Sequence, residues 1–152
     1  MQKMFTGLLM IWSLVACNSN TNSNVTADVQ QANDSAMATV SSCYAYMQNR
    51  DTILLDVTTT GNTFIGHLLY QLKEKDRNNG TLQGTIKGDT LIADYTFSSE
   101  GIRSVRQIAF LKQHEGLKEG FGELKLKNKQ WVFANLHTLQ FTGFLLTPTT
   151  CK

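Results

Sequence analysis

The most regular pattern in the chain is LQGTIKGDTLIADYTF, which covers residues 82–97. Small or apolar side chains alternate with polar ones on both sides of Gly88-Asp89, from Leu82 to Phe97. A period of two residues is typical of a β-strand with one buried and one exposed face. The glycine–aspartate pair between the two runs indicates a tight turn. This segment therefore predicts a hairpin in an antiparallel sheet.

Similar strand-like runs extend in both directions from this hairpin. Turn sequences such as Gly61-Asn62 and Asn78-Asn79-Gly80 separate them. A helix competes with the strand at residues 68–75, but Gly66 and the apolar alternation favour the strand. One helical turn is an option at residues 135–140. We expect the other strands at residues 43–47, 51–59, 63–73, 103–112, 117–126, 130–134 and 141–147.

A weak internal repeat suggests how many strands belong to one sheet. Asp51-Thr52-Ile53-Leu54 resembles Asp89-Thr90-Leu91-Ile92, and similarly spaced glycines and Leu-Lys pairs follow each copy. Two three-strand units plus one strand at each end give about eight strands, the number at which an up-and-down sheet closes into a small barrel. The predicted fold class is therefore all-β, an antiparallel meander that closes into a small lipocalin- or avidin-like barrel.

Residues 1–16 have the pattern of a lipoprotein signal peptide. Lys3 gives a positive start, residues 5–15 form an apolar run too short to span a bilayer, and Leu14-Val15-Ala16-Cys17 matches a lipobox. In bacterial lipoproteins the cysteine of this motif is acylated and becomes the first residue of the mature chain. We expect Cys17 to carry the lipid, for example palmitate, and to anchor the protein to a membrane. An ordinary signal peptide is the competing interpretation.

Composition divides the remaining chain into a tether at residues 17–42 and a folded domain at residues 43–152. The tether is rich in Asn, Ser, Thr, Ala and Gln, so it buries too little apolar surface to offset its ordering entropy. The sequence of 152 residues has a formal net charge of +2 and no basic patch. This charge pattern argues against a nucleic-acid partner.

Three cysteines are present. If Cys17 carries lipid, Cys43 and Cys151 remain as a pair in an oxidising compartment. A disulfide between them would close a loop of about a hundred residues, for which chain entropy gives roughly 4–5 kcal/mol of stabilisation. The alternative is two unrelated thiols, one buried and one in the C-terminal tail.

Several short motifs in residues 43–123 carry a family resemblance. They are Cys43-Tyr44-Ala45-Tyr46, Gly88-Asp89-Thr90, Asp94-Tyr95-Thr96-Phe97, Ser99-Glu100-Gly101 and Phe110-Leu111-Lys112. With these motifs the domain resembles a group of small lipoproteins found in Bacteroidota, whose members have no assigned activity.

The resemblance implies location and topology but no mechanism. It also implies O-glycosylation at Ser35, because that phylum modifies motifs such as Asp34-Ser35-Ala36. Asp51-Thr52-Ile53 and Asp89-Thr90-Leu91 also fit this pattern.

Motifs for catalysis and for metal binding are missing from the sequence. His67, His114 and His137 are not at ligand spacing to one another or to a cysteine, which argues against zinc. There is no Gly-x-Ser-x-Gly motif, no P-loop and no dinucleotide fingerprint. We therefore expect no catalytic residues, no metal and no cofactor.

The best remaining candidates for ligand or partner contact are Glu100, Arg103, Arg106 and Glu119, with Glu123 nearby. The two arginines open one predicted strand, and the glutamates at 119 and 123 lie on its expected hairpin partner. One hypothesis is a polar cluster at the mouth of the barrel that binds an anionic ligand. The other, which we favour, is a set of solvated cross-strand pairs worth about 0.2–1 kcal/mol each.

The sequence thus predicts a non-enzymatic, lipid-anchored module that binds a small apolar ligand or another envelope protein. An apolar pocket would draw on the aromatic residues, although a barrel of this size is more often filled by its own side chains. The alternative is an envelope hydrolase or a hydrolase inhibitor, for which residues 98–103 would be the protruding loop. No acidic run follows Cys17, so the expected location is the periplasmic face of the outer membrane.

Overall fold

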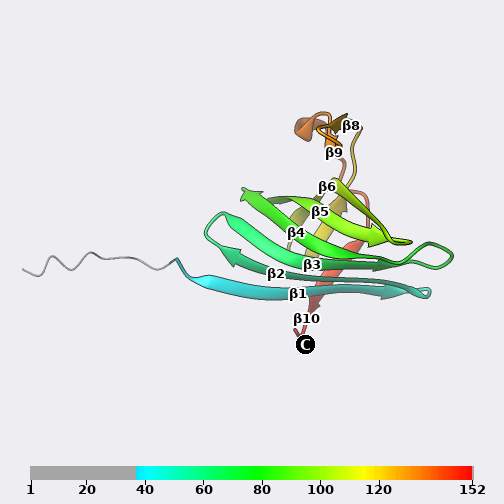
Figure 1. Cartoon of the computed structure of the whole chain (residues 1–152). Coiled ribbons are helices and arrows are strands. Elements are labelled where there is room, and N and C mark those ends of the chain that lie inside the picture. The colour runs from blue at the N-terminus through cyan, green and yellow to red at the C-terminus, as the bar shows by residue number, and fades with distance from the viewer. Residues whose placement is uncertain (1–36, 152) are drawn as a thin grey trace, which may run out of the picture. The chain divides into compact units, whose positions relative to one another are not determined.

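The computed structural model describes residues 37–151, and this part of the chain is almost entirely β-structure (Figure 1). Cys17, Ser35 and the signal peptide expected at 1–16 lie outside the described residues. The elements are β1 (Thr39–Gln48), β2 (Asp51–Thr60), β3 (Thr63–Gln71), β4 (Asn78–Lys87), β5 (Thr90–Ser99), β6 (Ile102–Gln113), β7 (Gly116–Gly120), β8 (Leu124–Lys127), β9 (Gln130–Phe133), the 3₁₀ helix η1 (Leu136–Thr138) and β10 (Leu145–Thr149).

Eight of these strands close into an antiparallel barrel. The strands β1 to β6 each pair with the next in sequence, and β10 lies between β7 and β1 to complete the ring. The six strands of the two repeat units are β2–β4 and β5–β7, with β1 and β10 added at the ends. The predicted all-β fold class and its small eight-stranded barrel are confirmed, and β8 and β9 are additional.

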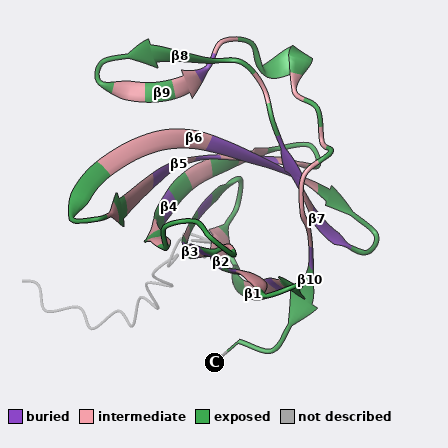
Figure 2. Ribbon diagram, turned by 90° about the vertical axis from the view of Figure 1, so that its right-hand side faces the viewer, coloured by how far each residue is buried: buried purple, intermediate pink, exposed green. Residues whose placement is uncertain are grey.

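The interior is filled by alternate side chains from every long strand. On β2, for example, Ile53, Leu55 and Val57 are buried while Leu54 and Asp56 are exposed. In Figure 2, buried stretches lie along the strands of the barrel beside intermediate and exposed ones. The period of two seen in the sequence is therefore the direct cause of the core. Its buried members are Ile53, Leu55, Val57, Phe64, Leu68, Tyr70, Leu82, Leu91, Ala93, Tyr95, Ile108, Phe110, Leu117 and Leu146.

The predicted turn at Asn78-Asn79-Gly80 is wrong, because these residues begin β4. Gly80 lies opposite Phe97 on β5, and a Cβ at this position would overlap the backbone of Thr96. The glycine thus permits a close approach of two strands rather than a turn. The real connection between β3 and β4 spans residues 72–77 and includes Glu74 at φ +59°.

Other predicted boundaries also differ from the structure. The last strand, expected at residues 141–147, is β10 at Leu145–Thr149. β1 begins at Thr39, so residues 39–42 are strand rather than tether, and they pair with β2 from Thr60 to Val57. The single strand expected at residues 117–126 is split into β7 and β8. Phe121 bridges Gln140 at the break, and Gly122 fits between Leu139 and Phe133.

The barrel wall is incomplete at one end because β7 and β10 are half as long as β1, β2, β4 and β5. The chain leaves the wall after Gly120, forms the β8–β9 hairpin and η1, and returns at Leu145. β9 lies parallel to the first half of β6, where Trp131 pairs with Arg106. This excursion, residues 121–144, therefore covers one opening of the barrel, where β7 and β10 are too short to form the wall.

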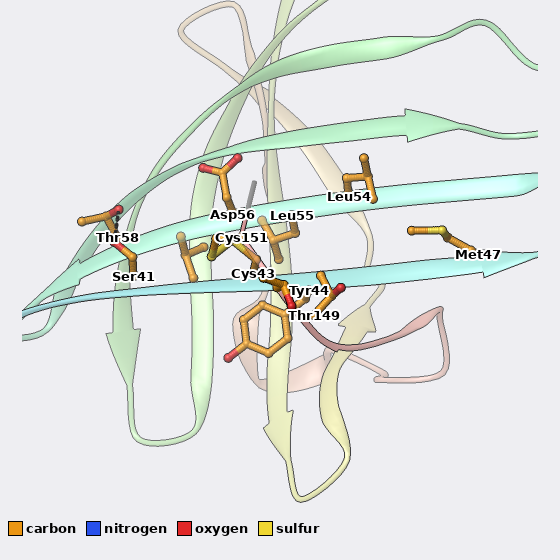
Figure 3. Close-up of a pocket in the computed structure, with 12 residues that line it drawn as sticks. Ser41, Cys43, Tyr44, Met47, Leu54, Leu55, Asp56, Thr58, Thr149 and Cys151 are labelled. Atoms are coloured by element: carbon orange, nitrogen blue, oxygen red, sulfur yellow. Dashed lines mark hydrogen bonds between the residues drawn. A yellow bond between two sulfur atoms is a disulfide. The ribbon is translucent and has the colours of Figure 1, made fainter.

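The predicted Cys43–Cys151 disulfide is confirmed. Its Cα atoms are 5.2 Å apart, and it joins residues 108 positions apart in the sequence. The bridge lies on the outside of the barrel, beside Asp56 and Thr149 (Figure 3). It fastens the first strand to the segment after the last one. Within residues 37–151, no helix is long and apolar enough to cross a membrane.

We expect the double variant Cys43→Ser, Cys151→Ser to lose about 4–5 kcal/mol of its free energy of unfolding, because the unfolded chain regains the entropy of a long loop. Urea unfolding monitored by circular dichroism measures this loss, and reduction of the wild-type protein should reproduce it. A loss below about 1 kcal/mol would contradict the entropic role of the bridge.

Candidate functional site

A pocket of about 430 Å³ opens at the incomplete end of the barrel. Three connections converge there: the β3–β4 loop, the β5–β6 turn and the excursion between β7 and β10. The pocket combines apolar walls from Leu72, Phe121 and Phe144 with several polar side chains. The full lining is Tyr70, Leu72, Lys75, Asp76, Asn78, Ser99, Arg106, Glu119, Phe121 and Phe144.

Glu119 is the buried acid of this pocket, with 6% of its surface exposed. The Tyr70 hydroxyl donates a hydrogen bond of 2.5 Å to the Glu119 carboxylate. The backbone holds Glu119 on both sides, since its N–H donates to the Phe144 carbonyl and its carbonyl accepts from the Gly143 N–H. Glu119 is thus fixed on β7 at the point where the short strands end.

Arg106 projects from β6 toward three aromatic rings. Its guanidinium carbon lies 5.8 Å from the centroid of Tyr70, 5.9 Å from that of Tyr95 and 5.3 Å from that of Phe97. These distances are within the range of cation–π attraction, which is stronger at desolvated sites. Tyr95 stacks on Phe97 with centroids 4.9 Å apart and donates a hydrogen bond to the Leu68 carbonyl. The aromatic shell therefore stabilises the cation from inside the barrel.

Two polar atoms in the pocket lining have no hydrogen-bond partner within the protein. They are the Nε of Arg106 and the Oδ1 of Asn78, and both are buried. A buried polar group without a partner costs about 1–3 kcal/mol. One of these atoms is a donor and the other an acceptor, so together they offer two complementary contacts to a molecule in the pocket.

The electrostatics of the site follow from burial. Desolvation raises the pKa of Glu119, while the hydrogen bond from Tyr70, the charge of Arg106 and the hydrogen bond to the Phe144 backbone oppose this rise. Burial, followed by the negative charge of Glu119, raises the pKa of Tyr70 well above its ordinary value. Burial also raises the pKa of Tyr95 to about 12, and Arg106 opposes it. Both tyrosines are therefore neutral hydrogen-bond donors at physiological pH.

The structure brings together Arg106 and Glu119 but not the other predicted contact residues. Glu100 occupies the tight β5–β6 turn at φ +49°, and Arg103 is exposed on the outer side of β6. Among residues 37–151 the ion pairs are His67–Asp56 and Lys73–Glu74, so the expected Arg–Glu pairs are not formed. The register explains this, since Arg106 lies opposite Tyr95 and Glu119 lies opposite Phe110.

Sequence reasoning missed Tyr70 and Asn78. The link between Tyr70 and Glu119 spans 49 residues and depends on closure of the barrel, so no local pattern indicates it. Asn78 belonged to the expected turn. Its position in the sequence carried no signal for a pocket, because the Asn-Asn-Gly run is typical of turns.

A second hollow, a groove of about 450 Å³, lies on the outer wall beside the disulfide (Figure 3). Two of its polar side chains, Ser41 and Thr58, share a hydrogen bond of 3.1 Å. The two buried polar atoms that lack a partner belong to the end pocket and not to this groove. In the part of the chain that the structure describes, no three His, Cys, Asp or Glu side chains are placed to hold a metal ion.

The raised pKa of Glu119 predicts a pH-dependent stability. Below its ordinary value of 4.5 the residue is protonated in both the folded and the unfolded protein, and its stabilising contribution is complete. As pH rises through the folded-state pKa, this contribution is lost. The Glu119→Gln variant lacks this loss, so its stability relative to wild type should increase as pH rises above 4.5.

Urea unfolding across a pH series measures this difference. The exposed Glu115 provides the control, because Glu115→Gln should differ from wild type by a constant amount over the same pH range. A difference in stability between Glu119→Gln and wild type that does not change with pH would contradict the raised pKa of Glu119.

Comparisons of the chain with protein-family models, with curated proteins and with solved structures find no match. The function is therefore argued from the pocket itself.

Proposed function

We propose that the protein is a lipid-anchored, non-enzymatic binding protein of the cell envelope. Its ligand would be a small molecule with an apolar body and an anionic or hydrogen-bond-accepting group, held in the pocket at the open end of the barrel. The observation that carries this proposal is the half-buried Arg106 in its aromatic shell, with a buried Nε that has no partner in the protein.

The size and lining of the pocket support a ligand of this kind. Its volume of about 430 Å³ lies within the ~300–1,000 Å³ range of small-molecule sites. Phe121 and Phe144 would contact the apolar body, and Asn78 Oδ1 would accept a hydrogen bond from an O–H or N–H group of the ligand. Arg106 would contact the acceptor group, and charge-assisted hydrogen bonds of this type are about twice as strong as neutral ones.

The same residues favour binding over catalysis. No histidine or cysteine is among the described residues that line the pocket. The Glu119 carboxylate is engaged by Tyr70, which is held neutral by its raised pKa. An activated nucleophile needs an adjacent base that can take its proton, and the lining offers no such pair.

The envelope location rests on the sequence alone. The lipobox that ends at Cys17 predicts an acylated N-terminus, and the Asn- and Ser-rich segment after it would link the barrel to the bilayer. The periplasmic face of the outer membrane is the location we propose.

Anilinonaphthalene sulfonate is a suitable probe for the pocket because it joins an aromatic body to an anionic group. We expect it to bind the folded wild-type protein, and the Arg106→Met variant to bind it about tenfold more weakly, since a hydrogen bond to a charged group is lost. Fluorescence titration measures both affinities, and thermal unfolding verifies that each variant is folded.

Arg103→Met is the matched control, because Arg103 lies on the same strand but is exposed. It should bind the probe as wild type does. Equal binding by all three proteins would refute the pocket as the binding site.

The anchor has its own test, independent of the pocket. Radiolabelled palmitate should enter the wild-type protein in cells, and Cys17→Ser should abolish the labelling. A Cys43→Ser, Cys151→Ser variant should still be labelled. If wild type takes up no label and Cys17→Ser stays cell-associated as before, the lipid anchor is disproved.

A further inference from the structure

The β8–β9 hairpin presents an exposed apolar face that the pocket does not use. Its register places Leu124 opposite Phe133 and Leu126 opposite Trp131, so these four side chains share one face. Phe133 is buried, but Leu126 is 61% exposed and Trp131 is 49% exposed. β9 pairs with β6 of the barrel, and Figure 2 shows β8 beyond it, exposed along its length.

The charges of this hairpin are all positive. Lys125 and Lys127 project from the opposite face, and Lys129 lies in the turn at φ +64°. Residues 124–133 contain no acidic side chain. A solvent-exposed tryptophan and leucine beside three lysines form a combination that suits the interface of an anionic bilayer, where tryptophan is enriched and lysine contacts headgroups.

A second copy of the chain is a poorer occupant of this surface. β8 is the outermost strand of the sheet, so another β8 could in principle add to its edge. That pairing would bring Lys125 and Lys127 close to the same lysines of the second copy, and like charges on paired strands are destabilising. Lysine on an edge strand is a common means of preventing such pairing.

We propose that the β8–β9 hairpin docks on an anionic lipid surface. Leu126 and Trp131 enter the headgroup–acyl boundary, and Lys125, Lys127 and Lys129 contact the anionic headgroups. The lysine stems are long enough to lie along the hairpin while their ammonium groups reach the lipid. This contact is separate from the acyl anchor and orients the barrel on the membrane.

Trp131 itself reports the docking. The chain has two tryptophans, so in the full chain carrying Trp12→Phe every tryptophan signal comes from Trp131. We expect its emission to shift to shorter wavelength with vesicles of phosphatidylcholine and phosphatidylglycerol, and to be quenched when the lipids are brominated. Phosphatidylcholine vesicles alone should give neither effect. The readout is the environment of Trp131, so it does not depend on an acyl group at Cys17.

Lysine and leucine variants separate the charged and apolar contributions to docking. Lys125→Gln, Lys127→Gln, Lys129→Gln should abolish the shift and the quenching, whereas Lys73→Gln, Lys87→Gln, Lys112→Gln, which removes three exposed lysines elsewhere, should keep them. Leu126→Ser should weaken the quenching in anionic vesicles.

Three results would overturn the proposal. The first is an unchanged Trp131 emission in anionic vesicles. The second is equal quenching in neutral and anionic vesicles that survives removal of the hairpin lysines. The third is a Trp131 emission that is already shifted to shorter wavelength without lipid. If that shift depends on protein concentration, a second copy of the chain covers Trp131. If it does not, another part of the same chain covers it.

Discussion

The barrel depends on the seam where its last strand meets its first. Most neighbouring strands pair over nearly their whole length, but β10 pairs with β7 only at Leu145 and Leu146 and with β1 only from Cys43 to Ala45. This seam also joins the ends of the domain, so its closure cannot rely on a short connecting turn. The disulfide lies at this seam and holds it shut. The rest of the ring is a simple meander in which each hairpin positions the next.

A short seam has a consequence for the interior. Because β7 and β10 end early, one end of the barrel is not sealed by strand side chains, and a polar cluster can exist there without being cut off from the exterior. Arg106 and Glu119 share this region without forming an ion pair, and aromatic rings replace the missing counter-charge around the arginine. A buried carboxyl group and a half-buried guanidinium thus lie close to the opening, and each contacts Tyr70.

The sequence was sufficient for most of the barrel because alternation reports which side of a strand is buried. It also predicted the disulfide, through the count of cysteines, and it named Arg106 and Glu119 as members of a polar cluster. The period of two places Arg103 and Arg106, three residues apart, on opposite faces of their strand. The sequence could not show which side chains of other strands each arginine meets, because that depends on the closed barrel. The path of residues 121–144 outside the barrel could not be predicted, because irregular segments have no hydrophobic period. The turn predicted at Gly80 was wrong because a glycine required by close strand packing looks the same in sequence as one required by a turn.

The covalent link between Cys43 and Cys151 encloses nearly the whole folded domain in one loop. A protease that cleaves once at any point between these residues produces two pieces that remain bonded to each other. Shedding of any fragment of the barrel therefore requires at least two cuts or a reductant. A protein built in this way tolerates an isolated nick without release of its parts, which is an advantage wherever proteases are abundant and replacement is slow.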